Sequence, residues 1–322
     1  MNRVFRVLLI CFCGVRISAV EPYLRITDGE DGARILEIAV RTLLAPDGSE
    51  RRIHLVGVSH VGTQAYYDAL QAKLDRMDLV LFEGVGGDRE EFLRRDPEAD
   101  AAELQPALAR AVGLRFQLHA MDYLRPHFVN SDLSPGELMA LFAGNNPEDL
   151  TEEGLARLEA TLASMQGDGL NAELMRMFLG LIERHPPFAL GVRWALVEIL
   201  GTVRGDLASI QGLPQDLEEM LTVLLRERNA VVIRDTRQVL SEENPPANLA
   251  IFYGAAHMHE LEQHLGEVLG FRPEKTTWLP AFQGNLSRSG LGRMQQNLLR
   301  HLVMQQVRLL EGLMEKDRGD RS

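Results

Sequence analysis

The stretch Ile53–His60 has the sequence IHLVGVSH, and Ile251–His257 repeats its pattern as IFYGAAH. Each is a short apolar strand that ends in Gly-x-x-His, and each is followed by an amphipathic segment with helical spacing. The small residues after each Gly let the backbone turn sharply. In an open α/β sheet, ligands bind at the edge formed by the carboxyl ends of the strands. The pattern therefore predicts that His60 and His257 reach one site from distant parts of the chain.

The chain around the first motif predicts a β-hairpin followed by a βαβ unit. Ala33–Leu44 alternates and is rich in branched residues, Pro46-Asp47-Gly48 is a turn signal, and Arg51–Gly57 returns as a strand. A helix over 63–75 and the strand Met77–Phe82 follow. A helical crossover joins parallel strands, so the strands on either side of this helix are expected to be parallel.

The remaining chain predicts further helices and a few strands around the second motif. The fold class expected is α/β, with a small central sheet that carries the paired strand–GxxH–helix units, plus a helical insertion at about 135–213. The expected domains are a signal peptide at 1–19, the α/β domain at 20–285, and a C-terminal helix and tail at 286–322. Before the insertion, the expected elements are a helix at Ala101–Val112, a strand at Phe116–Met121 and a loop at His127–Pro135, in which Ser134 is a helix N-cap. After it, they are one long helix at Pro214–Glu242, a strand at Leu249–Tyr253, a helix ending near Leu269, an edge strand at Thr276–Ala281 and a final helix from Leu286.

The first residues have the pattern of a secretory signal. Arg3 and Arg6 precede the apolar run Val7–Val15, and Ile17-Ser18-Ala19 suits a signal-peptidase site. A buried N-terminal strand and a wrongly assigned start codon are the alternative interpretations. Both cysteines of the chain lie inside this segment, at Cys11 and Cys13, so a chain cleaved after Ala19 would have no disulfide and no thiolate ligand.

Composition excludes several classes of function. The formal net charge is −12, and no basic stripe interleaved with aromatic residues occurs, which argues against a nucleic-acid partner. No apolar stretch reaches the roughly 20 residues that span a bilayer, so no stable membrane span is expected after signal removal. The sequence has no GxSxG, P-loop or GxGxxG motif, which disfavours α/β-hydrolases, P-loop NTPases and dinucleotide enzymes.

The two motif histidines are candidate metal ligands or bases. Each is expected at a helix N-terminus, where about half a positive charge disfavours imidazolium. A neutral imidazole can bind a metal ion or accept a proton. The simpler alternative is that His60 and His257 each cap a helix or bond to a backbone group.

Glu83 is the third candidate, because it closes the apolar strand Met77–Phe82. A carboxylate in this setting is costly to bury unless it has a partner. If the strand lies beside that of His60, Glu83 reaches the same sheet edge. Two His and one Glu with an open coordination position form a known catalytic metal set. A helix-cap or salt-bridge glutamate is the alternative.

Other polar residues have weaker support. Arg228, on the long predicted helix, could hold a substrate carboxylate or pair with Glu83. Asp122 and Tyr123 also follow a predicted strand.

The segment after His257 also resembles a zinc-binding helix but lacks its second ligand. His259 precedes a Glu, yet Gln263 stands where HExxH requires His. His259 is therefore at most a rim residue, and His264 is expected at the surface.

Four short motifs together resemble the TraB/GumN family, which includes the TIKI proteins and the pheromone-shutdown proteins. They are GVSH at 57–60, FEGV at 82–85, Arg228-Asn229 and GAAH at 254–257, and the resemblance covers roughly residues 33–285. It implies a compact α/β core with a divided GxxH site and a metal-dependent, peptidase-like activity with manganese or cobalt. By match, His60, Glu83 and His257 take the metal or catalytic positions, and Arg228 takes that of the family's arginine. The membrane-anchored members have a C-terminal hydrophobic segment that is not found in this sequence.

The leading hypothesis is a secreted or periplasmic metal-dependent hydrolase acting on a peptide or small-molecule substrate. His60 and His257 would hold a divalent metal (Mn, Co or Zn), and Glu83 would complete the ligand set or act as general base. Arg228 would steady the substrate or the developing oxyanion. One alternative is a metal-free hydrolase that uses His and Glu. The other is a non-catalytic protein that binds a peptide or a metal complex.

Overall fold

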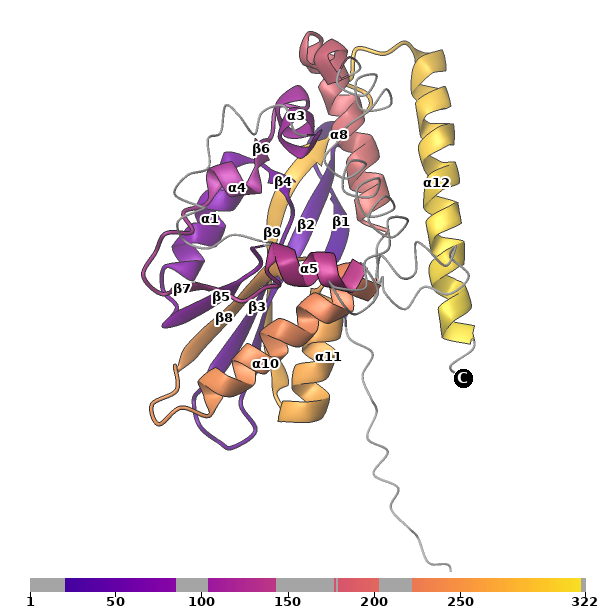
Figure 1. Ribbon diagram of the computed structural model, residues 1–322. Helices are drawn as coiled ribbons and strands as arrows, with labels where there is room; N and C mark the ends of the chain where they lie inside the picture. Colours follow the sequence, from indigo (N-terminus) through magenta and orange to yellow (C-terminus); the bar gives the residue numbers. More distant parts are fainter. Residues whose placement is uncertain (1–20, 85–103, 143–176, 178, 203–221, 320–322) are drawn as a thin grey trace, which may run out of the picture.

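A mixed β-sheet forms the centre of the protein (Figure 1). The computed structural model describes residues 21–84, 104–142, 177, 179–202 and 222–319. In these residues six strands of the seven-stranded main sheet follow the order β1-β2-β3-β8-β5-β7. Strands β1 and β3 pair with different halves of β2, and the seventh strand, β9, pairs with β2 along its whole length. The strands are β1 (Leu24–Asp28), β2 (Arg34–Leu44), β3 (Arg52–Val58), β5 (Leu79–Phe82), β7 (Phe128–Asn130), β8 (Asn248–Gly254) and β9 (Arg272–Gly284).

Strand β8, which carries the second GxxH motif, lies between β3 and β5. It pairs in parallel with β3, where Val58 is opposite Gly254, and in parallel with β5, where Phe82 is opposite Phe252. The prediction that β3 and β5 are parallel is therefore confirmed, but the two strands are not neighbours. Because the carboxyl ends of all three strands meet at one sheet edge, the residues that follow them are brought together.

Helices cover both faces of the sheet, which confirms the predicted α/β fold class (Figure 1). The first face packs against α1, α3 and α8, and the second packs against α10 and α11. The described helices are α1 (Gln64–Leu74), α3 (Leu104–Ala111), α4 (Gln117–Ala120), α5 (Pro135–Phe142), α8 (Pro186–Leu200), α10 (Arg228–Leu240), α11 (Met258–Leu269) and α12 (Arg293–Gly319).

The side chains of the central strand β8 point alternately to the two faces of the sheet, which explains why helices cover both faces. In β8, Ala250 and Phe252 belong to the first face, whereas Leu249, Ile251 and Tyr253 belong to the second. All five are buried, so neither face of β8 can be left to water. Burying one large apolar side chain stabilises the fold by about 1.5–3 kcal/mol.

Local sequence signals place the ends of several helices. The Thr63 side chain accepts a hydrogen bond from the N–H of Tyr66 at 3.2 Å and so caps α1 where the sequence predicts its start. Ser134 and Glu137 form a reciprocal capping box on α5, which confirms Ser134 as its N-cap. Helix α11 ends at Gly270, whose left-handed φ of 73° suits a residue without Cβ.

Two short segments differ from their predictions. Phe116–Met121 is not a strand: Arg115–Phe116 pairs with Val61–Gly62 in a separate two-stranded sheet, and Gln117 then begins the short helix α4. The segment expected to be a loop at His127–Pro135 contains β7, which pairs with β5. Three residues are too few to show a strand period in the sequence.

Other predictions agree within a few residues where they can be compared. The predicted edge strand at Thr276–Ala281 belongs to β9, which among the described residues pairs with β2 alone, and the predicted final helix begins at Arg293 rather than Leu286. Of the long predicted helix, residues 214–221 lie outside the described residues, and a π-helical turn η5 (Thr222–Glu227) leads into α10. The predicted signal peptide and much of the predicted helical insertion also lie outside the described residues.

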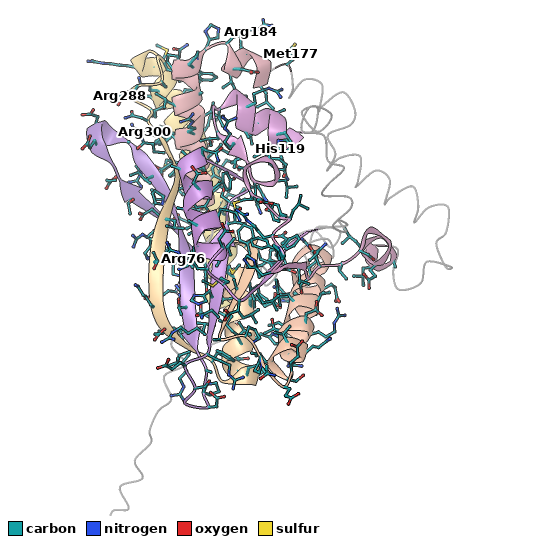
Figure 2. The ribbon with its side chains drawn as sticks, turned by 90° about the vertical axis from the view of Figure 1, so that its left-hand side faces the viewer. Arg76, His119, Met177, Arg184, Arg288 and Arg300 are labelled. Carbon is teal, nitrogen blue, oxygen red and sulfur yellow. The ribbon has the colours of Figure 1, made fainter. Side chains whose placement is uncertain are left out.

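The terminal helix α12 packs on the outer side of α8. Val303 and Val307 contact Trp194 in a small apolar cluster, while Arg300 is exposed on α12 at this end of the molecule (Figure 2). Among the described residues, no helix combines the length and apolarity needed to cross a membrane.

Replacing Gly284 by Ala should separate α8 from β9. A Cβ at this position would overlap the backbone of Arg193 and Trp194, which cannot move without shifting α8. We expect Gly284→Ala to lower the free energy of unfolding by about 3 kcal/mol, measured by chemical denaturation. The matched control is Gly312→Ala in α12, where a Cβ meets nothing within 4 Å. Equal denaturation midpoints for the two variants would contradict this packing.

Candidate active site at the ends of β3, β5 and β8

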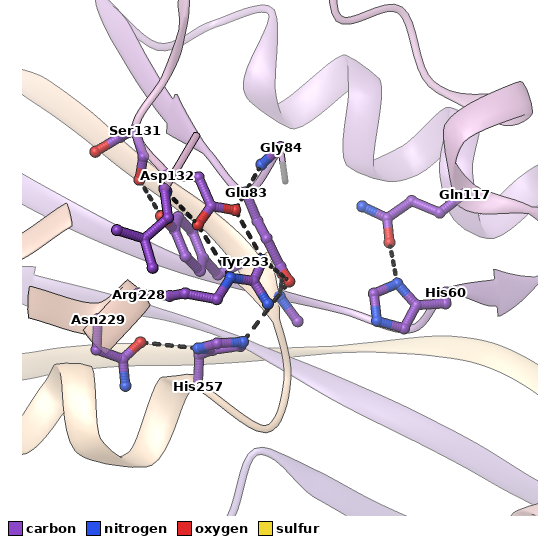
Figure 3. A network of polar contacts seen from close by, with 12 residues as sticks. His60, Glu83, Gly84, Gln117, Ser131, Asp132, Arg228, Asn229, Tyr253 and His257 are labelled. Carbon is purple, nitrogen blue, oxygen red and sulfur yellow. Dashed lines mark hydrogen bonds and ion pairs between the residues drawn. The ribbon is translucent and has the colours of Figure 1, made fainter. Parts of the chain in front are cut away.

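The sheet edge brings together His60, Glu83 and His257, the residues that the sequence predicts as metal ligands (Figure 3). They surround Gly254, the last residue of β8. A Cβ on Gly254 would lie 3.2 Å from Glu83 Oε2, 3.6 Å from His257 Cδ2 and 3.9 Å from His60 Nε2. The absence of a side chain at Gly254 therefore lets the three groups lie close to its backbone.

Arg228 joins Glu83 to a second carboxylate, that of Asp132. Its Nη2 lies 2.6 Å from Glu83 Oε1 and 2.7 Å from Asp132 Oδ2, and its Nε lies 3.0 Å from Asp132 Oδ1. The side chains of Arg228 and Asp132 are only 7% and 0% exposed. The sequence suggests that Arg228 holds a substrate carboxylate or pairs with Glu83, and the geometry shows the pairing with Glu83.

The surroundings of Glu83 favour its ionised form. Burial by itself raises the pKa of this carboxyl, but His257, Arg228 and His60 lower it, and so does the hydrogen bond from the N–H of Gly254 to Oε2 at 2.6 Å. The resulting pKa is about 2. Glu83 is therefore an anion at neutral pH, and such a weak base suits ligation or electrostatics better than proton abstraction.

His257 is buried and has a fixed tautomer. Asn229 donates from Nδ2 to Glu260 at 2.7 Å, so its carbonyl oxygen faces His257 Nδ1 at 2.9 Å. Nδ1 must then carry the hydrogen, which leaves a lone pair on Nε2. Burial lowers the pKa of His257 to about 4 although Glu83 opposes this shift, so the ring is neutral at pH 7.

The Nε2 atom of His257 lies 3.6 Å from Glu83 Oε1. Both atoms are hydrogen-bond acceptors at neutral pH, since the imidazole hydrogen is on Nδ1. Two acceptors at this separation gain stability when a proton, a water molecule or a cation lies between them. This pair therefore marks the point of the site that is suited to an electropositive group.

His60 is exposed and is anchored from α4. Its Nδ1 lies 3.0 Å from Gln117 Oε1, while Gln117 Nε2 donates to the hydroxyl of Tyr123 at 2.8 Å. The backbone N–H of Gln117 also donates to the carbonyl of His60 at 2.8 Å. With Nδ1 bonded in this way, Nε2 faces the space over Gly254.

The segment that carries Asp132 is fixed by bonds from three elements. The N–H of Gly84 donates to Asp132 Oδ2 at 3.1 Å, and the Ser131 hydroxyl donates to Asp235 at 2.7 Å. The Tyr253 hydroxyl donates to the carbonyl oxygen of Ser131, and burial raises the pKa of this tyrosine. Asp132 is thus held against Arg228 independently of Glu83.

The π-helical turn before α10 helps to explain how neighbouring residues reach different targets. Such turns change the phase of a helix and often occur at functional sites. Directly after it, Arg228 bonds to Glu83 while Asn229 bonds to His257. Two adjacent side chains of one helix therefore support two different groups of the site.

The donor set suits a divalent cation. Two imidazole nitrogens and one carboxylate are ligands that catalytic metal sites use, and an amide oxygen on each Nδ1 is the usual support for such rings. Within the described residues, however, no three His, Cys, Asp or Glu side chains are already arranged around an ion position. The Arg228 guanidinium already pairs with Glu83 Oε1, so a bound cation would share this carboxylate with it. A carboxylate oxygen has two lone pairs, so sharing is chemically allowed.

Sequence reasoning missed part of the site and named residues outside it. Asp132 and Gln117 were not named as candidates, because one lies in a segment expected to be a loop and the other in a segment expected to be a strand. Tyr123 supports His60 through Gln117, whereas Asp122 is exposed and bonds to the N–H of Leu124. His264 lines a neighbouring groove.

The stability of the protein should fall in mild acid because of His257 and Glu83. The ordinary pKa of His is 6.5, and that of His257 in the folded protein is lowered to about 4. Between these two pH values the unfolded chain binds this proton and the folded protein does not, so a falling pH favours unfolding. The lowered pKa of Glu83 removes further stability between pH 4.5 and about 2. The melting temperature should therefore decline below pH 6.5. His257→Gln should flatten this decline between pH 6.5 and 4, whereas His301→Gln on α12 should not; equal slopes in both variants would argue against a buried neutral His257.

Removing the guanidinium of Arg228 should strongly destabilise the fold. Arg228→Met leaves the buried carboxylates of Glu83 and Asp132 without their cation, and we expect a loss of about 3–5 kcal/mol in the free energy of unfolding. Asp132→Asn added to Arg228→Met should recover part of the loss. Arg234→Met, whose side chain is 69% exposed, should cost less than about 0.5 kcal/mol. Similar small losses for Arg228→Met and Arg234→Met would show that the buried ion cluster does not form.

A scan of the sequence against protein-family models, a search of curated proteins and a search of solved structures each found no match. The resemblance to the TraB/GumN family therefore rests on the four short sequence motifs. The case for a function rests on the geometry of the site.

Proposed function

We propose that this protein is a hydrolase whose site consists of His60, Glu83 and His257, with a divalent cation as its expected cofactor. The observation that carries the proposal is the arrangement around Gly254. Two imidazoles, each bonded to a side-chain amide through Nδ1, face an ionised carboxylate across a space that a single Cβ would occupy. A small electropositive group beside Gly254 would be within reach of both imidazoles and the carboxylate.

Each residue has a distinct proposed role. The Nε2 atoms of His60 and His257 would hold the cation, and Glu83 would complete its ligands. A bound divalent ion supplies a Lewis acid and lowers the pKa of water at neutral pH. The described hydrogen bonds of Arg228 go to Glu83 and Asp132, so we assign it the role of a positioning residue that keeps Glu83 anionic and oriented. This replaces the oxyanion-stabilising role that the sequence suggested.

The proposed substrate is a peptide, and the proposed location is secreted or periplasmic. The peptidase-like reaction follows from the resemblance to the TraB/GumN family, and the location follows from the signal pattern of the first 19 residues. The exposed ring of His60 supports a site that opens to solvent and admits an extended substrate.

Metal-free hydrolysis is the second candidate, and the Glu83–Arg228 pair favours it. The guanidinium already compensates the charge of Glu83, as a cation would. In this case His60 would act as general base towards water, because its Nε2 faces the open space and its Nδ1 is held by Gln117.

Metal content tests the proposal directly. The chain from residue 20 onward would be purified as wild type, His60→Ala, His257→Ala and the control His301→Ala, and each would be analysed by mass spectrometry after reconstitution with Mn, Co or Zn. We expect about one ion per chain in the wild type and the control, and loss in both site variants with unchanged far-UV circular dichroism.

Hydrolysis of a peptide library, with and without exhaustive chelation, separates the candidates. Activity that chelation abolishes supports the metal-dependent hydrolase. Activity that survives chelation and is lost in His60→Ala supports the metal-free one. Absence of both bound metal and activity in a folded wild-type protein would refute both, and peptide binding without turnover would then indicate a binding protein.

A further inference from the structure

A groove of about 320 Å³ lies beside the site, between α10 and α11. Arg226, Arg234 and Arg237 line it from the side of α10, and His264 lines it from α11. Arg234 and Arg237 are three residues apart on α10 and so lie on one face of this helix, and Arg226 precedes them in the π-helical turn η5. We call this feature the arginine groove.

The arginine groove has an apolar base and a cationic rim. Ile233 and Leu261, which also line it, are 6% and 0% exposed, whereas the side chain of Arg234 is 69% exposed. The whole chain has a formal net charge of −12, so a cluster of arginines is opposite in sign to the net charge of the chain. Two carboxylates are already engaged here: Glu260, which lines the groove, accepts a hydrogen bond from Asn229, and Asp235 pairs with Arg234 at 3.0 Å. The chemistry of the groove therefore suits a ligand with an apolar body and anionic groups.

The arginine groove extends to the residues that hold the His257 ring in place. Asn229 and Glu260 both line it, and the same two residues form the hydrogen-bond chain that reaches His257 Nδ1. A ligand in the groove would thus contact Asn229, the residue that is hydrogen-bonded to the imidazole of His257. This continuity distinguishes the groove from an isolated patch of surface arginines.

We propose that the arginine groove binds the anionic side chains, carboxylate or phosphate, of the substrate peptide and so makes the protein selective for acidic peptides. Guanidinium groups pair with both anions through two parallel hydrogen bonds, and the apolar base would receive the aliphatic part of the peptide. The substrate preference rests on the proposed function, whereas the binding itself does not.

Peptide binding in a variant with reduced turnover tests the arginine groove. In a His60→Ala background, fluorescence anisotropy would measure the Kd of three labelled peptides of equal length, which contain several Glu, several phosphoserines, or Gln in their place. We expect tight binding of the Glu or phosphoserine peptide and a Kd at least about tenfold weaker for the Gln peptide. The stronger of the two anionic peptides identifies the anion.

The matched variants are two pairs of arginine replacements. Arg234→Gln with Arg237→Gln should weaken binding of the anionic peptide about tenfold and reduce its salt dependence. Arg300→Gln (Figure 2) with Arg308→Gln, two exposed positions on α12, should change the Kd less than about twofold. Equal Kd values for the two pairs, or no preference for either anionic peptide over the Gln peptide, would overturn the proposal.

Turnover separates this proposal from the hydrolase proposal. If the wild type cleaves peptides but the groove pair leaves KM for acidic peptides unchanged, the groove fails and the hydrolase stands. If acidic peptides bind through the groove but no peptide is cleaved, the groove stands and the hydrolase fails. If both hold, the groove pair should raise KM for acidic peptides about tenfold while kcat stays nearly constant.

Discussion

The buried carboxylate of Glu83 is the constraint around which this end of the sheet is built. An ionised carboxylate that leaves water is costly unless charges and hydrogen bonds replace its hydration. Here the compensation comes from Arg228 on α10 and from the N–H of Gly254 at the end of β8. The guanidinium is then balanced in turn by Asp132, next to β7. One charge therefore requires three parts of the chain to converge, and such buried networks define a unique arrangement more than they add net stability.

The same convergence organises the proposed chemistry. Each imidazole is oriented by a side-chain amide: Gln117 holds His60 from one side of the sheet edge, and Asn229 holds His257 from the other. Supports of this kind fix ring tautomers before any substrate arrives. Asn229 also lines the arginine groove, so recognition and catalysis would share one residue. Asn229 therefore connects the groove to the ring of His257.

The sequence was sufficient to predict the ends of the strands but not their neighbours. Both Gly-x-x-His motifs and Glu83 follow strongly apolar runs, so their place at a sheet edge could be derived from strand patterning. The insertion of β8 between β3 and β5 could not, since apolar strands buried on both faces look alike in sequence whatever their order. Asp132 was missed for a different reason: it follows a strand of three residues, too short for its period to be visible. Gln117 was hidden in an apolar stretch whose alternation resembles a strand, although its amide is turned towards His60.

The central position of β8 has a consequence for how the protein is made. Strands β3 and β5 leave the ribosome long before residues 248–254, which must later be inserted between them. Until then their inner edges have unpaired backbone groups, and such edges are prone to pair with other chains. The site also lacks His257 and the Gly254 N–H until β8 is in place. The sheet and the candidate site are therefore completed together, by the one strand that is inserted between two others.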